Sequence, residues 1–383
     1  QTNSMRSKLA FIINEYAFFK SHRYHLISLL SSYYDIEIIT DLSALKGHKT
    51  DIGTNSNIKF THSSKRTPSI NPLKFFTFIQ QLKNKIDRGD PDYIFFVSLE
   101  NCFIGAILSR YIDTKNNFFL VTGLGSFFNT NSLKGKLKKF LYKIVFQFLL
   151  SPKNKFVFQN IDDQTDLKLF IMNNQIKSSI IEGNGIDTNK FCFHERFMKN
   201  LNQEIKFLFA SKLQKEKGIL EFINASKVLK KRYPETSFYI AGEFDPTNKL
   251  SIERSEFNAM KECKEMNYLG IIQNNEMPAL FKEYDVFILP SYREGLPSVA
   301  LEAAATGMPL IMSNVPGCKS IIENNKNGYL VEPRSKSSII LAVEKIINNK
   351  EKLDYFSHRS RAIVEERFQI EKILTQYLDL INS

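Results

Sequence analysis

The chain has no tryptophan, only four cysteines and no long hydrophobic run. Cys102, Cys192, Cys263 and Cys318 are widely spaced and match no metal-ligand motif. That spacing excludes a disulfide scaffold and indicates a reducing compartment. Every apolar stretch is shorter than the roughly 20 residues that span a bilayer, and residues 9–13 are too few for a signal-peptide core. We therefore expect neither a membrane-spanning helix nor a secretory leader.

Glycine and proline are also scarce, with 16 and 12 among 383 residues, whereas 43% of the residues are hydrophobic. The low glycine and proline content excludes a fibrous or low-complexity chain, and the apolar content excludes a disordered one. The length exceeds what one hydrophobic core usually supports. We expect a globular protein of two domains.

Acidic residues are much scarcer than basic residues only in the first half of the chain. Residues 1–190 carry 25 Lys and Arg against 15 Asp and Glu, whereas residues 191–383 carry 27 against 25. Such a localised surplus indicates an anionic partner, which could be a nucleic acid, a phospholipid surface or an anionic substrate. Nucleic acid is the least favoured of the three, because no nucleic-acid-binding module is recognisable.

Short apolar strands alternate with helix-length segments along the whole chain. The predicted strands are residues 8–14, 36–40, 58–63, 93–98, 117–122, 155–160, 179–183, 206–210, 237–242, 267–270, 286–290, 309–313 and 328–331. Strands that are apolar on both faces are typical of parallel sheets covered by helices on each side. This α/β pattern predicts two doubly wound Rossmann-like domains, with ligands bound at the carboxyl ends of the strands in a cleft between the domains.

We place an N-terminal domain at residues 5–190 and a C-terminal domain at residues 191–366. A polar, charged stretch near the boundary precedes the strand at residues 206–210. The last segment, residues 367–383, has apolar side chains at helical spacing. We expect it to form a helix that packs back on the first domain.

Residues 285–317 are the segment most informative about chemistry. A buried strand leads into a loop with Glu294 and Gly295, and Pro297 stands where a helix begins. The open amides of such a helix N-terminus, around residues 296–299, suit a phosphate or pyrophosphate. Glu294 and Glu302 could each accept hydrogen bonds from the hydroxyls of a ribose or a sugar ring.

A second cationic loop follows the strand at residues 206–210. It contains Lys212 and Lys217, with Gly218 before the next helix. Two cations on one loop suit a diphosphate, whose charge grows as a glycosidic bond breaks. We expect Lys217 to be the more important of the two.

Together these segments resemble the family-4 glycosyltransferases, which have the two-Rossmann-domain GT-B architecture. The hallmark frame of that family is matched by Glu294, Gly295, Pro297, Leu301, Glu302, Ala303, Ala305, Gly307 and Pro309. The resemblance implies that Glu302 holds the nucleotide ribose and that Glu294 contacts the donor sugar. It also implies that Lys212, Lys217 and the start of the helix at Leu296, Pro297, Ser298 and Val299 surround the diphosphate, and that Ile271 lies by the nucleobase. Lys212 stands where most members have arginine.

Two segments of the first half resemble the branch of this family that builds bacterial surface polysaccharides. They are residues 14–26, which lack the paired glycines of many members, and residues 122–128. The resemblance implies that His22, Arg23, Gly123 and Gly125 lie on the acceptor side of the cleft. Many relatives have a histidine near residue 122, but this chain has Thr122, so no catalytic histidine is expected there.

Residues 133–150 predict a basic amphipathic helix. Its apolar stripe comprises Leu133, Leu137, Phe140, Leu141, Ile144, Val145 and Phe148. Its cations are Lys134, Lys136, Lys138, Lys139 and Lys143, and residues 115–159 contain no acidic side chain. Such a helix could rest on an anionic membrane. A core helix with a lysine-rich exposed face fits the same pattern.

The sequence thus predicts a retaining glycosyltransferase of O-antigen, capsule or related glycan synthesis. We expect an N-acetylhexosamine to pass from UDP-GalNAc or UDP-GlcNAc to a polyprenyl-diphosphate-linked saccharide, at the inner face of the bacterial cytoplasmic membrane. No cofactor and no divalent metal are expected, because Asp90 and Asp92 flank a proline and predict a turn. The alternatives are a nucleotide-sugar 2-epimerase and a non-catalytic, membrane-associated carbohydrate-binding protein.

Overall fold

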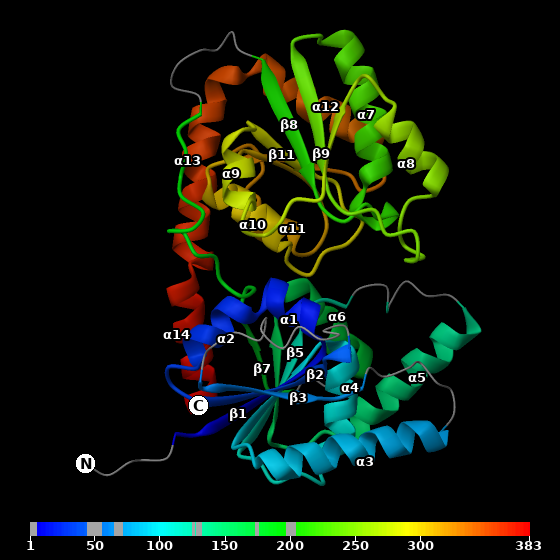
Figure 1. Ribbon diagram of the computed structural model, residues 1–383, viewed down its shortest axis with the longest axis vertical. Helices are drawn as coiled ribbons and strands as arrows, with labels where there is room; N and C mark the ends of the chain where they lie inside the picture. The colour runs from blue at the N-terminus through cyan, green and yellow to red at the C-terminus, as the bar shows by residue number, and fades with distance from the viewer. Residues whose placement is uncertain are drawn as a thin grey trace. The chain divides into compact units, whose positions relative to one another are not determined.

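A computed structural model describes residues 6–43, 56–64, 72–124, 127, 132–172, 176–196 and 204–383. The chain divides into two compact units (Figure 1). Unit 1 comprises Gln1–Asn184 and Glu371–Ser383, and unit 2 comprises Gly185–Ile370. Each unit is built on a parallel sheet, so the predicted α/β class is confirmed. The chain first leaves unit 1 after Asn184, where the sequence prediction has residue 190.

Unit 1 contains a seven-stranded parallel sheet in the order β3-β2-β1-β4-β5-β6-β7. Its strands are β1 (Lys8–Glu15), β2 (Asp35–Asp41), β3 (Ile58–His62), β4 (Tyr93–Val97), β5 (Asn116–Val121), β6 (Asn154–Phe158) and β7 (Ser178–Ile180). The chain moves from β1 outward to β3 and then returns to β4 on the other side of β1. The strand order therefore reverses between β1 and β4.

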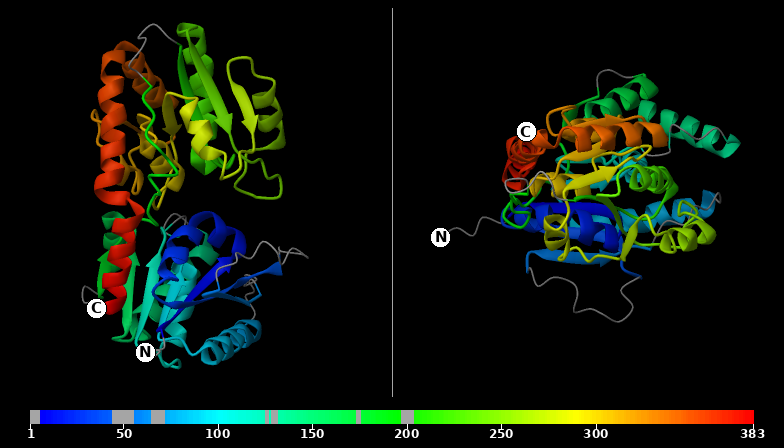
Figure 2. Two further views of the ribbon diagram at one scale, coloured as in Figure 1. Left: turned by 60° about the vertical axis from the view of Figure 1, so that its left-hand side comes forward. Right: turned by 90° about the horizontal axis from the view of Figure 1, so that it is seen from above.

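Helices cover both faces of this sheet (Figures 1 and 2). They are α1 (Tyr16–His22), α2 (Tyr24–Leu30), α3 (Pro72–Gly89), α4 (Leu99–Leu108), α5 (Leu133–Phe148), α6 (Ile161–Ile171) and α14 (Ile370–Asn382). Successive residues of one strand enter different cores: Phe95 packs with residues of α1, α2 and α14, and Phe96 packs with residues of α3 to α6. This alternation explains why the strands are apolar on both faces.

Helix α14, red in Figures 1 and 2, is the last element of the chain but belongs to unit 1. Ile373, Tyr377 and Ile381 are buried at helical spacing in the same core as Phe11 and Phe95. A short π-helical segment, Val364–Phe368, precedes it. The predicted return of the C-terminal helix to the first domain is confirmed.

Unit 2 contains a six-stranded parallel sheet in the order β10-β9-β8-β11-β12-β13. Its strands are β8 (Ile205–Ala210), β9 (Thr236–Ala241), β10 (Asn267–Gly270), β11 (Val286–Leu289), β12 (Leu310–Ser313) and β13 (Gly328–Val331). Its α-helices are α7 (Ile219–Arg232), α8 (Arg254–Lys261), α9 (Met277–Lys282), α10 (Ser298–Ala305), α11 (Cys318–Ile321), α12 (Lys336–Asn348) and α13 (Leu353–Ile363). Here the strand order reverses between β8 and β11. Within the described ranges of both units, no helix combines the length and the apolar character that crossing a membrane requires.

Candidate active site

Two loops meet at the carboxyl edge of the unit 2 sheet. One follows β8 and the other follows β11, and these two strands are hydrogen-bonded neighbours. The backbone N–H of Tyr292 in the second loop donates to the carbonyl of Glu216 in the first, at 2.8 Å. The loops flank the point where the strand order reverses, which is where open α/β sheets bind ligands.

An ion pair joins these loops. The Nζ of Lys217 lies 2.8 Å from Oε1 of Glu294, and the side chains are only 23% and 10% exposed. The Oγ of Ser291 donates a hydrogen bond to the same carboxylate oxygen at 2.7 Å. Removing either charge would leave the other poorly solvated, so the pair fixes both side chains in place.

Two glycines allow the loops to approach backbone atoms closely. Gly218 has φ +74°, and a Cβ there would lie 2.1 Å from the carbonyl oxygen of Pro290. Gly317 has φ +77°, and a Cβ there would lie 2.1 Å from the carbonyl oxygen of Gly295. No other residue type fits either position without moving the segment that carries Glu294.

Tyr292 anchors the loop after β11 from a further direction. Its hydroxyl donates to Oε1 of Glu221 at 2.7 Å, and the guanidinium of Arg334 lies 4.7 Å from its ring centroid. Burial, together with the hydrogen bond to Glu221, raises the pKa of Tyr292 to about 12, so the phenol keeps its proton. Sequence reasoning missed Ser291 and Tyr292, although both lie between a predicted strand and Glu294.

Helix α10 presents open amides at the same edge. Pro297 is its N-cap residue, and no described side chain caps this end of the helix. The amides of Ala300 and Leu301 donate to the carbonyl of Pro297, which leaves those of Ser298 and Val299 available. Leu296, one residue before the cap, is half-buried. The partial positive charge of such a terminus attracts an anion.

Glu302 lies on α10 and is half-buried. Among the residues that the structure describes, none forms a hydrogen bond with its carboxyl group. Removal from water raises the pKa of Glu302 to about 7, and the charge of Lys190 opposes that rise. This carboxyl group is therefore available to a ligand with hydroxyl groups.

Lys212 and Ile271 lie at the same edge of the sheet. Lys212 is exposed in the loop after β8, and Ile271, which follows β10, is 58% exposed. The strand ends are interlocked at Gly242, whose N–H donates to the carbonyl of Gly270 at 2.8 Å. A Cβ at Gly242 would lie 1.9 Å from the carbonyl oxygen of Ser211, beside Lys212. The structure thus gathers the predicted residues of the second half at one edge, with direct contact only between Lys217 and Glu294 among the contacts described.

Three of the four residues predicted on the acceptor side can be placed, all in unit 1. His22 is exposed at the end of α1, where its ring stacks on Phe18 and its Nδ1 lies 2.6 Å from Oγ of Ser21. Gly123 is half-buried just after β5, with φ +138°. Gly125 lies outside the described residues.

Arg23 has a role that the sequence did not predict. Its side chain is 2% exposed, and its Nη1 donates to the hydroxyl of Tyr377 in α14 at 3.4 Å. Burial lowers the pKa of Arg23, opposed by its interaction with Tyr377. The guanidinium therefore lies in the core of unit 1, where it joins the start of α2 to α14, and it is not exposed to a ligand.

Helix α5 points its apolar stripe away from the core. Six of the seven predicted stripe residues have exposed side chains, from Leu133 at 86% to Ile144 at 37%, and only Val145 packs partly against the core. The core side consists of Tyr142 and Phe146. The core-helix alternative is therefore wrong for this stripe, because its side chains are exposed. The five lysines, Lys134, Lys136, Lys138, Lys139 and Lys143, flank the stripe.

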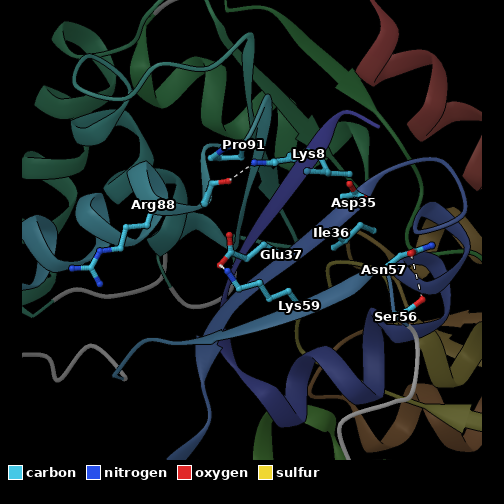
Figure 3. A pocket seen from close by; sticks show the side chains of 11 residues that line it. Lys8, Asp35, Ile36, Glu37, Ser56, Asn57, Lys59, Arg88 and Pro91 are labelled. Carbon is cyan, nitrogen blue, oxygen red and sulfur yellow. Dashed lines mark hydrogen bonds and ion pairs between the residues drawn. The ribbon is translucent and has the colours of Figure 1, made fainter. Parts of the chain in front are cut away.

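A cavity of about 400 Å³ opens at the amino edge of the unit 1 sheet (Figure 3). Glu37 of β2 lies in it beside Lys59 of β3, with 3.6 Å between Nζ and Oε1, and Arg88 points away from this pair. No residue predicted to take part in catalysis lines this cavity. It lies at the end of the strands opposite to Gly123.

The Asp-Pro-Asp segment connects α3 to β4 and is held by an ion pair between Asp92 and Lys115. Asp90 has φ +50°, and Oδ2 of Asp92 accepts a hydrogen bond from the N–H of Lys8 at 2.9 Å. A hydrogen bond from Lys115 lowers the pKa of Asp92. In the part of the chain that the structure describes, no cluster of His, Cys, Asp and Glu could hold a metal ion.

Comparison with known proteins finds a family that matches most of unit 2. Residues 193–363 match the family described as "Glycosyl transferases group 1". The chain is 29% identical over 303 residues to an N,N'-diacetylbacillosaminyl-diphospho-undecaprenol alpha-1,3-N-acetylgalactosaminyltransferase of Campylobacter jejuni, covering 73% of this chain and 75% of the relative. It is 27% identical over 327 residues to a UDP-Gal:alpha-D-GlcNAc-diphosphoundecaprenol alpha-1,3-galactosyltransferase of Escherichia coli, covering 82% of each.

The fold also matches a solved structure along almost its whole length. Sucrose-phosphate synthase from Thermosynechococcus elongatus superposes with a TM-score of 0.79 over 98% of both chains, at 17% sequence identity. At that identity the match shows a shared fold. The group 1 family is matched across most of unit 2, and both relatives are named as glycosyltransferases, so the chain is a glycosyltransferase.

Proposed function

We propose that this enzyme transfers a sugar from a UDP-linked donor to a polyprenyl-diphosphate-linked saccharide, with retention of the anomeric configuration. The observation that carries the donor half of this proposal is the shielded pair of Lys217 and Glu294, 2.8 Å apart at the switch point of unit 2. The pair supplies a cation and a carboxylate at the sheet edge where α10 has open amides. A nucleotide sugar needs both, a cation for its diphosphate and an acceptor for its hydroxyls.

The donor would bind along the carboxyl edge of unit 2. Lys217, Lys212 and the amides of Ser298 and Val299 would hold the diphosphate, and Glu302 would accept hydrogen bonds from the ribose. Glu294 would hold the donor sugar, and the exposed Ile271 would lie by the base. In this arrangement the protein acts by positioning the donor and by stabilising the charge of the leaving group.

The reaction needs no protein base in this proposal. The bond between the anomeric carbon and the diphosphate oxygen breaks, and a bond to an acceptor hydroxyl forms on the same face of the sugar. The acceptor proton passes to the leaving diphosphate. Lys217 would stabilise the negative charge that remains on that group, and neither a cofactor nor a divalent metal is required.

The donor sugar is proposed from chemistry shared with the relatives. The Campylobacter jejuni relative is named as an N-acetylgalactosaminyltransferase, and the Escherichia coli relative is named for UDP-Gal. Both names specify an α-1,3 linkage to a sugar carried on undecaprenyl diphosphate. We place UDP-GalNAc first, ahead of UDP-GlcNAc, with surface polysaccharide or related glycan synthesis as the pathway class.

Unit 1 would bring the enzyme to its lipid-linked acceptor through α5. The exposed side chains of Leu137, Phe140 and Ile144 form an apolar stripe whose contact with water is unfavourable. Lysines flank this stripe. Apolar insertion combined with positive charge is the combination that binds an interfacial helix to anionic lipid. The enzyme would therefore rest on the inner face of the cytoplasmic membrane.

A panel of nucleotide sugars tests the catalytic proposal. Purified enzyme is incubated with each donor, with and without a polyprenyl-diphosphate-linked saccharide, and released UDP and product are measured. We expect UDP release with UDP-GalNAc and an α-linked product when the acceptor is present. Conversion of the donor to a free 2-epimer would instead support the epimerase, and absence of any turnover would contradict an active transferase.

Vesicle flotation tests the membrane proposal. We expect the enzyme to float with vesicles containing anionic lipid and to lose about ten-fold or more of that binding when Leu137, Phe140 and Ile144 are changed to serine. Leu341 on α12 of unit 2 is similarly exposed, at 60%, so Leu341→Ser is the matched control and should bind normally. Equal binding by all three proteins would overturn the docking role of α5.

A further inference from the structure

One residue at the carboxyl edge of unit 1 has a strained backbone. Ser98 follows β4 and has φ +91° and ψ 153°, a region that is almost restricted to glycine. Other non-glycine residues with positive φ, such as Asp90 and Met172, have φ values of 50° and 54°. Those values are in the left-handed region that L-residues can adopt. Ser98 is therefore the residue whose side chain conflicts most with its backbone among those described.

Neighbouring bonds hold Ser98 in this conformation. Its N–H donates to the carbonyl of Leu120 in β5, and its carbonyl accepts from the N–H of Cys102 in α4, both at 2.9 Å. Asn101, which is 3% exposed, donates through Nδ2 to the carbonyls of Val97 and Ile12 at 2.7 and 3.2 Å. Strain that is held by so many bonds is typical of functional positions.

The position of Ser98 in unit 1 corresponds to that of the loop after β11 in unit 2. The strand order of unit 1 reverses between β1 and β4, and Ser98 directly follows β4 at that point. In unit 2 the order reverses between β8 and β11, and the loop after β11 carries Glu294. The end of β4 is thus the place in unit 1 where its topology favours a ligand.

The Ser98 hydroxyl can form more hydrogen bonds than the described residues provide. It accepts one long hydrogen bond, at 3.4 Å, from the N–H of Asn101. Within the described residues, no group accepts a hydrogen bond from it. The side chain is half-buried, so part of it remains accessible at the edge. Gly123, at the end of the neighbouring strand β5, lets a ligand approach the backbone beside it.

We propose that Ser98 contacts the acceptor saccharide and donates a hydrogen bond to one of its hydroxyl or carbonyl oxygens. The inference rests on the proposed function, in which unit 1 takes the acceptor. Glycine would relieve the backbone strain but would lose the hydroxyl. Ser98 is also the N-cap residue of α4, but the cap occupies only the acceptor capacity of its hydroxyl, through the bond from Asn101. The strained serine therefore keeps a hydroxyl that can still donate at this point of the switch.

The test uses Ser98→Gly, which removes strain and hydroxyl, and Ser98→Ala, which removes the hydroxyl alone. We expect both to raise the KM for the lipid-linked acceptor about three- to ten-fold, as loss of one hydrogen bond does. Donor hydrolysis without acceptor should be unchanged, and Ser98→Gly should raise the Tm. Asp90→Gly, before the same strand, is the matched control and should leave the acceptor KM unchanged.

An unchanged acceptor KM in both Ser98 variants would overturn the proposal. Equal losses of acceptor transfer and of donor hydrolysis would also overturn it, because they indicate a general structural role. Failure of the proposed function is seen separately in the unaltered enzyme. If that enzyme hydrolyses the donor but transfers nothing to the lipid-linked acceptor, the proposed acceptor class is wrong, and the role of Ser98 falls with it.

Discussion

Both units reverse their strand order in the same way but place different chemistry at the reversal. In unit 2, the loops after β8 and β11 contribute an ion pair of Lys217 and Glu294. In unit 1, the ends of β4 and β5 contribute the hydroxyl of Ser98 and the backbone of Gly123. One architecture thus provides an ion pair at the reversal in one unit, and a hydroxyl group and a glycine at the reversal in the other. The difference fits a charged diphosphate on unit 2 and a saccharide on unit 1.

Backbone conformation also differs between the two edges. In unit 2, the strands β8, β9 and β10 are followed by or end in glycines with positive φ, namely Gly218, Gly242 and Gly270. In unit 1, the equivalent strain is carried by Ser98. Glycine provides close approach without a side chain, whereas serine retains a hydroxyl group despite the strain. We therefore expect changes of charge and of close packing at the carboxyl edge of unit 2 to have effects of different size.

The largest effect is expected from the ion pair. Lys217→Ala and Glu294→Ala should each lower transfer by about 100-fold or more, because each removes a charge that acts on the donor. Lys215→Ala is the matched control, since Lys215 pairs with Glu253 and Glu256 away from Glu294. Steady-state transfer and circular dichroism should show inactive but folded variants. A near-normal transfer rate in Lys217→Ala or Glu294→Ala would show that the ion pair at the unit 2 edge is not needed for transfer.

A smaller effect should separate two glycines of unit 2. Gly218→Ala would place a Cβ 2.1 Å from a backbone oxygen, whereas Gly270→Ala meets nothing within 4 Å. We expect losses of about 3 kcal/mol and about 1 kcal/mol in unfolding free energy, measured by urea denaturation. Gly218→Ala should also lower transfer, because it displaces Lys217. Equal losses of unfolding free energy would show that the positive φ, and not the close approach to a backbone oxygen, determines the cost of alanine at both positions.

The smallest effect is expected from Glu302, and it should depend on pH. The raised pKa of about 7, against an ordinary value of 4.5, means that the native state holds this proton more tightly than the unfolded state. Its contribution to stability is therefore fully present below about pH 4.5 and is lost as the pH rises to 7. Glu302→Gln should raise the unfolding free energy by about 1–3 kcal/mol at pH 8 and change it little at pH 4.5.

The same variant should bind the donor more weakly at pH 8. An amide accepts fewer hydrogen bonds than a carboxylate, so we expect a higher donor KM together with the higher Tm. Thermal scans at the two pH values and donor titrations would measure both changes. A Glu302→Gln enzyme with lower stability at pH 8, or with unaltered donor KM, would contradict the assigned role of this carboxyl group.

Local patterning predicts most of the fold. Each of the thirteen strands of the two sheets lies at a predicted strand, with ends that differ by no more than three residues. The signal is strong because strands buried on both faces are continuous apolar runs, such as residues 94–97 and 286–289. Helix α10 also begins and ends where Pro297 and Gly307 indicate. Strand order was not predicted, since pairing partners are far apart in sequence.

The candidate site was predicted where a frame of spaced residues marks it and missed where contacts are tertiary. Glu294 and Lys217 stand out in the sequence, but they are 77 positions apart and form an ion pair only because β8 and β11 are neighbouring strands. The support by Ser291 and Tyr292 has no pattern of its own. Arg23 shows the opposite error: a polar residue in an exposed-looking segment is buried by α14, which comes from the other end of the chain.

The place of α14 has a consequence for the order of folding. Unit 2 is a continuous stretch, Gly185–Ile370, inserted between the two parts of unit 1. During synthesis, unit 2 therefore has all its residues before unit 1 does, although it is encoded later. Until α14 leaves the ribosome, the face that includes Phe95 and Arg23 lacks its cover of Ile373 and Tyr377. Deletion of α14 would accordingly damage the N-terminal unit first.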